Sequence, residues 1–153
     1  DPDRIAVAGG SAGGNLAAML GVTGPADGLE PLGEGSTKVS CAIDFYGAVD
    51  LLHYHDMKMF AKTRIEAPEL YVKGSPITYV DAQDAPLLLV HGTKDETVAL
   101  SQSETLAAKC KEAGLEHELI VVPSAPHTFK LVEDGIDLRP QVFAFLDKHL
   151  KRS

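Results

Sequence analysis

The 153-residue sequence has no tryptophan, only two cysteines and an aromatic content of 6%. Cys41 and Cys110 are too few for a disulfide framework or a metal cluster, so we expect two buried free thiols. No apolar run approaches the roughly 20 residues that a membrane-spanning helix needs. Basic residues are also scarce, because 14 of them face 22 acidic residues and the net charge is −8. That charge disfavours nucleic acid as a partner.

The remaining composition is typical of a folded protein, with 44% apolar and 24% charged residues. The length fits one domain over 1–153, and we find no internal repeat or compositional step that would mark a second one. The first residues, Asp-Pro-Asp-Arg, hold neither an initiator methionine nor the apolar core of a signal peptide. The sequence therefore leaves the cellular compartment open.

Four short apolar runs recur along the chain, and residues with helical spacing follow three of them. The runs lack the polar alternation of half-exposed strands, which is typical of strands covered on both faces of a parallel sheet. They occupy residues 5–8, 39–46, 86–90 and 118–122. The repeated order of a strand pattern followed by a helix pattern predicts a three-layer α/β/α architecture with a mostly parallel sheet of about four strands.

Two stretches break the pattern. The glycine-rich residues 24–36 favour a surface loop. Residues 51–80 mix histidine, methionine and aromatics without clear periodicity, and we interpret them as a possible cap or insert over a site. The sequence His-Tyr-His-Asp at 53–56 has no matching ligand pair elsewhere, so we expect no metal site there.

A Gly-x-Ser-x-Gly motif, residues 9–13, stands between the first strand pattern and a helix pattern. A serine on such a sharp turn needs small neighbours that let strand and helix approach closely, and its hydroxyl then projects above the sheet. The helix start offers the Ala12 N–H and a positive dipole end to a developing oxyanion. The motif alone fits equally well a glycine-rich helix entry that binds phosphate or nothing.

A serine hydroxyl needs a base and an orienting acid, and two later strand patterns lead to such residues. Asp95 follows the strand pattern at 86–90, and His127 follows the one at 118–122. Asp95 could instead cap a turn, and His127 could simply pack in a loop. The order Ser11, Asp95, His127 is that of α/β-hydrolases, so the sequence favours a nucleophile, an acid and a base at one sheet edge.

Five stretches together resemble the carboxyl-terminal half of an α/β-hydrolase of the esterase/lipase kind, near the acetylxylan or feruloyl esterase-like and prolyl oligopeptidase-related branches. They are Gly-Gly-Ser-Ala-Gly-Gly-Asn-Leu-Ala at 9–17, Asp-Phe-Tyr-Gly-Ala-Val-Asp-Leu at 44–51, Ser-Pro-Ile-Thr-Tyr-Val at 75–80, His-Gly-Thr-Lys-Asp-Glu-Thr-Val at 91–98 and Val-Pro-Ser-Ala-Pro-His-Thr-Phe at 122–129. The resemblance implies Ser11 as nucleophile, Asp95 as orienting acid, His127 as general base and acid, and Ala12 as an oxyanion donor. It implies neither cofactor nor metal.

The resemblance implies a serine carboxylic-ester hydrolase that acts through an acyl-serine on a small ester, possibly an acylated carbohydrate. Two alternatives stay open. A serine peptidase of the prolyl oligopeptidase type would use the same residues. An inactive fragment or a non-catalytic binding module would keep the fold without the chemistry.

Two features depart from the family pattern. Ala125-Pro126 and Thr128 flank His127, where the family usually has glycines. Only ten residues precede Ser11, whereas family members place a His-Gly-Gly-Gly-type loop and several strands there. We therefore expect a partial fold that binds substrate poorly or is inactive when isolated. We also expect that the strand at 5–8 exposes an edge covered by a companion N-terminal segment or a homodimer partner.

Overall fold

The computed structural model describes residues 1, 3–29, 36–55, 58, 60–133 and 135–151. Part of the loop predicted at 24–36 lies outside these residues. The elements run in the order β1 (Ala6–Gly10), α1 (Ala12–Val22), β2 (Cys41–Phe45), α2 (Pro68–Lys73), β3 (Leu87–Gly92), α3 (Ser101–Ala113), β4 (His117–Val122), β5 (Val132–Glu133), β6 (Ile136–Asp137) and α4 (Arg139–Leu150), with 3-10 turns at Pro25–Asp27 and Pro76–Thr78.

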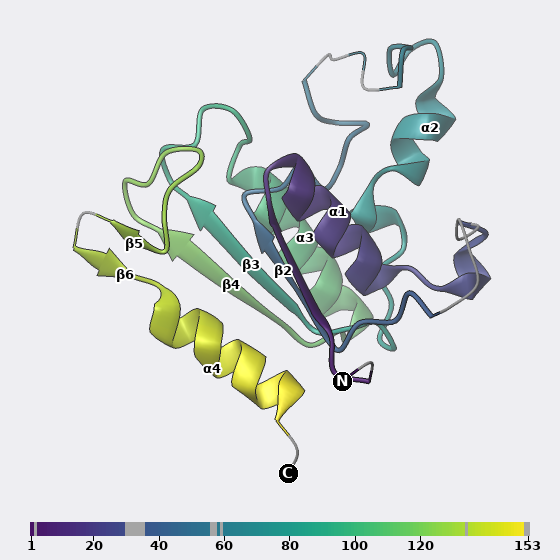
Figure 1. Cartoon of the computed structure of the whole chain (residues 1–153). Helices are drawn as coiled ribbons and strands as arrows, with labels where there is room; N and C mark the ends of the chain where they lie inside the picture. Colours follow the sequence, from purple (N-terminus) through teal and green to yellow (C-terminus); the bar gives the residue numbers. More distant parts are fainter. Residues whose placement is uncertain (2, 30–35, 56–57, 59, 134, 152–153) are drawn as a thin grey trace.

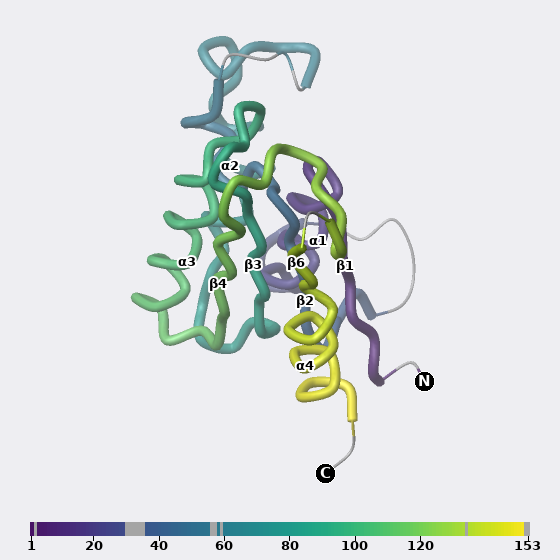
Figure 2. The backbone as a smooth tube through the Cα atoms, turned by 90° about the vertical axis from the view of Figure 1, so that its left-hand side faces the viewer, coloured from purple at the N-terminus to yellow at the C-terminus, as the bar shows by residue number. Residues whose placement is uncertain are grey.

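Strands β1 to β4 form one parallel sheet in the order of the chain. Figure 2 shows the four strands following one another across the view in that order. All four predicted strands are confirmed, and no strand end lies more than two residues from its predicted position. Because every strand runs the same way, the loops that leave their carboxyl ends gather at one edge of the sheet.

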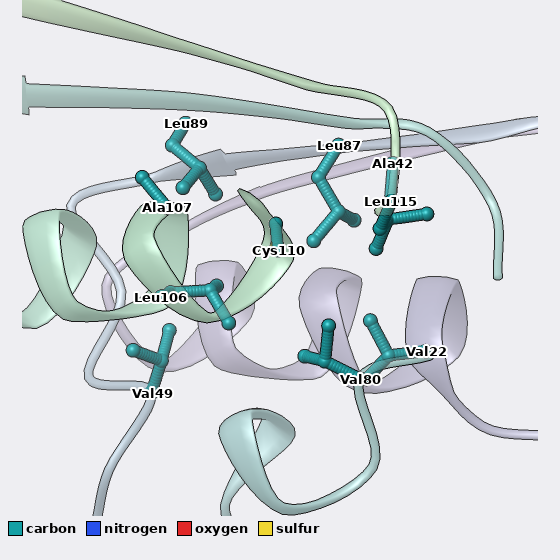
Figure 3. Packing of buried hydrophobic residues seen from close by; sticks show 10 residues of the cluster. All are labelled: Val22, Ala42, Val49, Val80, Leu87, Leu89, Leu106, Ala107, Cys110 and Leu115. Atoms are coloured by element: carbon teal, nitrogen blue, oxygen red, sulfur yellow. The ribbon is translucent and has the colours of Figure 1, made fainter. Parts of the chain in front are cut away.

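Helices cover both faces of the sheet, so the predicted three layers are present (Figure 1). Helices α1 and α3 pack on one face through a buried cluster that includes Leu87, Leu89 and Leu106 (Figure 3). Helix α4 covers the other face through a cluster that includes Leu88, Val90 and Phe145. The two faces use alternate residues of β3, which explains why its sequence shows no polar alternation. Cys41 and Cys110 are buried free thiols, as predicted.

Helix α1 presents a different face to the sheet from the one that its leucines alone would suggest. Helix α1 buries Ala17, Ala18 and Val22, whereas Leu16 is 64% exposed. A Cβ on Gly21 would come within 2.9 Å of Ala42 and Leu87, so small residues let this helix lie close to the sheet. A Cβ on Gly14, in the first turn, would clash with Asp44 Oδ1 in the same way, so the helix start after Ser11 also lies close to the sheet.

Candidate active site

Ser11 stands at the sharp turn between β1 and α1. Its backbone has φ 56° and ψ −120°, a region that residues with a side chain rarely adopt. Its N–H donates to the Phe45 carbonyl oxygen at 2.9 Å, which ties the turn to β2. A Cβ on Gly9 would come within 2.1 Å of the Gly13 carbonyl oxygen, so the motif needs its first glycine. The Ser11 hydroxyl caps no helix N–H and is available for other bonds.

Asp95 lies three residues beyond the end of β3, with its side chain fully buried. Its Oδ1 accepts hydrogen bonds from the N–H groups of Thr97 at 2.9 Å and Val98 at 2.8 Å. Burial raises the pKa of Asp95. The hydrogen bonds from His127, Val98 and Thr97 together lower it by more, so the net pKa lies below the ordinary value. The carboxyl group is therefore held as an oriented carboxylate.

His127 lies between the other two side chains. Its Nδ1 is 2.6 Å from Asp95 Oδ2, and its Nε2 is 2.9 Å from Ser11 Oγ. A carboxylate only accepts hydrogen bonds, so Nδ1 carries the proton and Nε2 accepts from the serine hydroxyl. The three side chains that the sequence analysis singled out thus come together, although Ser11 and His127 are 116 residues apart.

The loop that carries His127 is fastened to its neighbours. The N–H of Ser124 donates to Thr93 Oγ1 at 2.8 Å, and the N–H of Lys94 donates to the Ala125 carbonyl oxygen at 3.0 Å. The ring of Tyr46 meets the imidazole edge-on, with centroids 4.9 Å apart. Alanine and proline in place of the family glycines therefore leave the imidazole facing Ser11.

The predicted oxyanion donor, Ala12, is the first residue of α1. The N–H groups of a first helical turn have no acceptor within the helix, and the helix dipole adds positive potential there. The first turn of α1 itself contains no acidic residue. An oxygen that becomes negative near Ser11 would find a favourable environment.

Sequence reasoning missed two polar residues under this site. Asp44 is buried beneath the first turn of α1, and its Oδ2 has no hydrogen-bond partner among the residues that the structure describes. Burial raises its pKa to about 7, opposed by the hydrogen bond from the Gly47 N–H. Asn15 donates from Nδ2 to the carbonyl oxygens of Ala48 at 2.8 Å and Gly74 at 3.1 Å. Asp44 lies within an apolar run, where its pattern gave no sign of a role. The hydrogen-bond partners of Asn15 are distant in sequence, so its role could not be read from local spacing.

The part of the chain that the structure describes contains neither a cluster of metal ligands nor a membrane-spanning helix. No group of three or more ligating side chains could hold a metal ion there. His53 lies 75% exposed and pairs with Asp50 at 2.7 Å. None of the helices in that part is both long and apolar enough to span a membrane.

Comparison with known proteins gives one family match. The BD-FAE family model matches residues 1–110. The chain is also 34% identical over 143 residues to Esterase LipQ of Mycobacterium tuberculosis (strain ATCC 25618 / H37Rv), which covers 86% of this chain and 34% of LipQ. The chain therefore spans about a third of the length of this relative.

The fold is shared with solved structures, among them the following two. A truncated form of a carbohydrate esterase from gut microbiota superposes with a TM-score of 0.88 and 26% identity, covering 99% of this chain and 61% of the other. Thermogutta terrifontis esterase 2 phosphorylated by paraoxon superposes with a TM-score of 0.77 and 26% identity, covering 100% of this chain and 57% of the other. The four-stranded parallel sheet with its helices is therefore that of α/β-hydrolase esterases.

Proposed function

This chain belongs to the BD-FAE family, and we propose that it provides the catalytic residues of a serine esterase that cleaves carboxylic esters. One observation carries the proposal: Asp95, His127 and Ser11 form a continuous hydrogen-bonded series with distances of 2.6 and 2.9 Å. Such a series is what a serine nucleophile requires, because the base is within reach of the hydroxyl and the acid fixes the base.

The proposed reaction proceeds in two halves. As Ser11 Oγ bonds to the ester carbonyl carbon, its proton moves to His127 Nε2, and Asp95 stabilises the imidazolium. The carbonyl oxygen becomes negative and accepts a hydrogen bond from the Ala12 N–H group. When the intermediate collapses, the C–O bond to the alcohol breaks and His127 protonates the alcohol. Water then attacks the acyl-serine by the same route and releases the acid.

The relatives support this class of substrate. LipQ is named an esterase, one structural relative is a carbohydrate esterase, and the other has been phosphorylated by paraoxon. We infer a small carboxylic ester as the substrate, with acylated carbohydrates as a specific candidate class.

We further propose that residues 51–80 form a cap beside the catalytic groups. The Tyr54 hydroxyl donates to the Thr97 carbonyl oxygen at 2.8 Å, two residues from Asp95. Tyr54 and Tyr71 pack with Val98 in one buried cluster. The described part of this segment is therefore fastened to the acid loop, where it would limit the size of the acyl or alcohol group.

The direct test is ester turnover by the purified protein in the presence of its companion N-terminal segment. We expect hydrolysis of p-nitrophenyl acetate, with a stoichiometric burst of p-nitrophenol if deacylation is the slower half. Proline-containing peptides should be cleaved far more slowly. Faster cleavage of the peptides would contradict the esterase assignment, and no turnover of either substrate would contradict the proposed function.

We also propose that another polypeptide segment covers the outer edge of β1. Within the described sheet β1 pairs only with β2, and Ile5 and Leu16 near this edge are 47% and 64% exposed. An unpaired apolar edge favours pairing with a further strand. Size-exclusion chromatography with mass measurement should show a dimer or a complex with a second chain. A stable monomer of 16.3 kDa would contradict this proposal.

A further inference from the structure

A second histidine lies behind the acid of the candidate site. His91 is the fifth residue of β3, and the sequence analysis gave it no role in the chemistry. Its side chain is fully buried, and its Nδ1 is 2.7 Å from Ser103 Oγ on α3. Its Nε2 is 2.9 Å from the Val98 carbonyl oxygen and 3.3 Å from Asp95 Oδ2.

These contacts fix which nitrogen of His91 carries a proton. The Val98 carbonyl oxygen can only accept, so Nε2 is the donor. In the neutral ring, Nδ1 accepts a hydrogen bond from the Ser103 hydroxyl group, so both ring nitrogens have a hydrogen-bond partner. The Nε2–H group then lies between a backbone carbonyl and the same carboxylate oxygen that accepts from His127.

The Val98 contact bears directly on Asp95. The Val98 N–H donates to Asp95 Oδ1 at 2.8 Å, while the Val98 carbonyl oxygen accepts from His91. Val98 is therefore held by Asp95 through its N–H group and by His91 through its carbonyl oxygen. The turn at 95–98 is fixed in the orientation that directs Asp95 Oδ2 toward His127.

We propose that His91, whose ring orientation is fixed by Ser103, is a positioning residue that holds the Asp95 carboxylate in line with His127. The series of polar contacts runs from Ser103 through His91, Asp95 and His127 to Ser11. His91 does not meet the substrate; it acts through the direction of one carboxylate oxygen. This inference rests on the proposed function, because only a working triad gives that direction a kinetic consequence.

Two substitutions separate positioning from simple packing. In His91→Gln the side-chain amide reaches the place of Nε2 and can still donate to Val98. In His91→Asn the amide reaches only the place of Nδ1, so the donor to Val98 is lost. We expect kcat for p-nitrophenyl acetate to fall about 10- to 100-fold in the Asn variant, with KM changed by less than about twofold. The Gln variant should retain kcat within about fivefold of wild type.

Ser103→Ala is a second test that removes one oxygen atom and keeps the ring. We expect a fall in kcat of about threefold or more at constant KM, because the ring loses the partner that sets its orientation. Ser101→Ala, the same substitution at an exposed position of α3, is the matched control and should keep wild-type kcat. Circular dichroism and thermal melting identify which variants are folded.

Each outcome decides the proposal. A folded His91→Asn variant with wild-type kcat, or equal losses in the Asn and Gln variants, would overturn it. If neither histidine variant folds, wild-type kcat in Ser103→Ala would overturn it. These results differ from failure of the proposed function, in which the wild-type protein itself shows no turnover; that outcome would overturn both.

Discussion

Replacing Ser11 with alanine is expected to lower ester turnover by about 10⁶-fold, equivalent to about 8 kcal/mol of transition-state stabilisation. The change removes the only atom that forms a bond to the substrate, while the backbone donors of the oxyanion site stay in place. Stability should change little. Ser11 Oγ has a single hydrogen bond, to a half-buried imidazole, and it caps no helix N–H. The measurement is kcat/KM for p-nitrophenyl acetate in matched preparations.

Ser40→Ala is a suitable control for this variant. Ser40 Oγ also makes one hydrogen bond, to the Asp3 carbonyl oxygen at 3.3 Å, but it lies just before β2, at the opposite end of the strands from Ser11. This control should keep wild-type turnover. A Ser11→Ala protein with more than a few per cent of wild-type turnover would exclude Ser11 as the nucleophile.

His127→Ala is expected to slow acylation by about 10⁴- to 10⁶-fold. Without the imidazole the serine proton has no acceptor, and Asp95 loses the partner at 2.6 Å. Asp95 then keeps the hydrogen bonds from the N–H groups of Thr97 and Val98 and the contact of its Oδ2 with His91 Nε2 at 3.3 Å. The rate of p-nitrophenol release in the first turnover measures acylation directly.

His117→Ala is the control for the histidine variant. It removes an imidazole at the first position of β4, at the opposite end of the strands from the triad, whose Nδ1 lies 2.9 Å from the Leu115 carbonyl oxygen. Its acylation rate should stay close to wild type. Equal rates in His127→Ala and wild type would remove His127 from the mechanism.

The convergence of the three side chains could be predicted from sequence because each follows a strand pattern. Parallel strands present their carboxyl ends at one edge, so Ser11, Asp95 and His127 had to lie near one another once the strands were assigned. The short strands were identified because buried parallel strands read as unbroken apolar runs. What the pattern could not give is orientation, which depends on the turn at 95–98 and on the bonds of the His127 loop.

The polar support beneath the site was not predictable for a different reason. His91 precedes a glycine at the end of an apolar strand, and its partner Ser103 comes twelve residues later, on a helix face that only packing defines. Asp44 sits in an otherwise apolar strand, where one acidic residue carries little weight in a pattern. Both depend on contacts between elements, which periodicity within one element does not contain.

The helices show the same limit. The helical spacing of residues 142, 146, 149 and 150 would place them on one stripe of α4, but that stripe omits Phe145, which is among the most buried residues of the helix. Phe145 packs against the sheet together with Val142. Phe143, two residues earlier, is exposed. Spacing alone gives the period of a helix but leaves the exact direction of its buried face to the neighbouring layer.

The central claim is that Ser11 forms the covalent bond to the acyl group, and labelling with paraoxon followed by tandem mass spectrometry tests it most directly. Trypsin should release residues 5–38 as one peptide, which also contains Thr23, Ser36 and Thr37. We expect one diethylphosphoryl group per chain, with fragment ions that place it on Ser11. A modification on any other residue of that peptide, or an unmodified Ser11 in a protein that hydrolyses esters, would contradict the account.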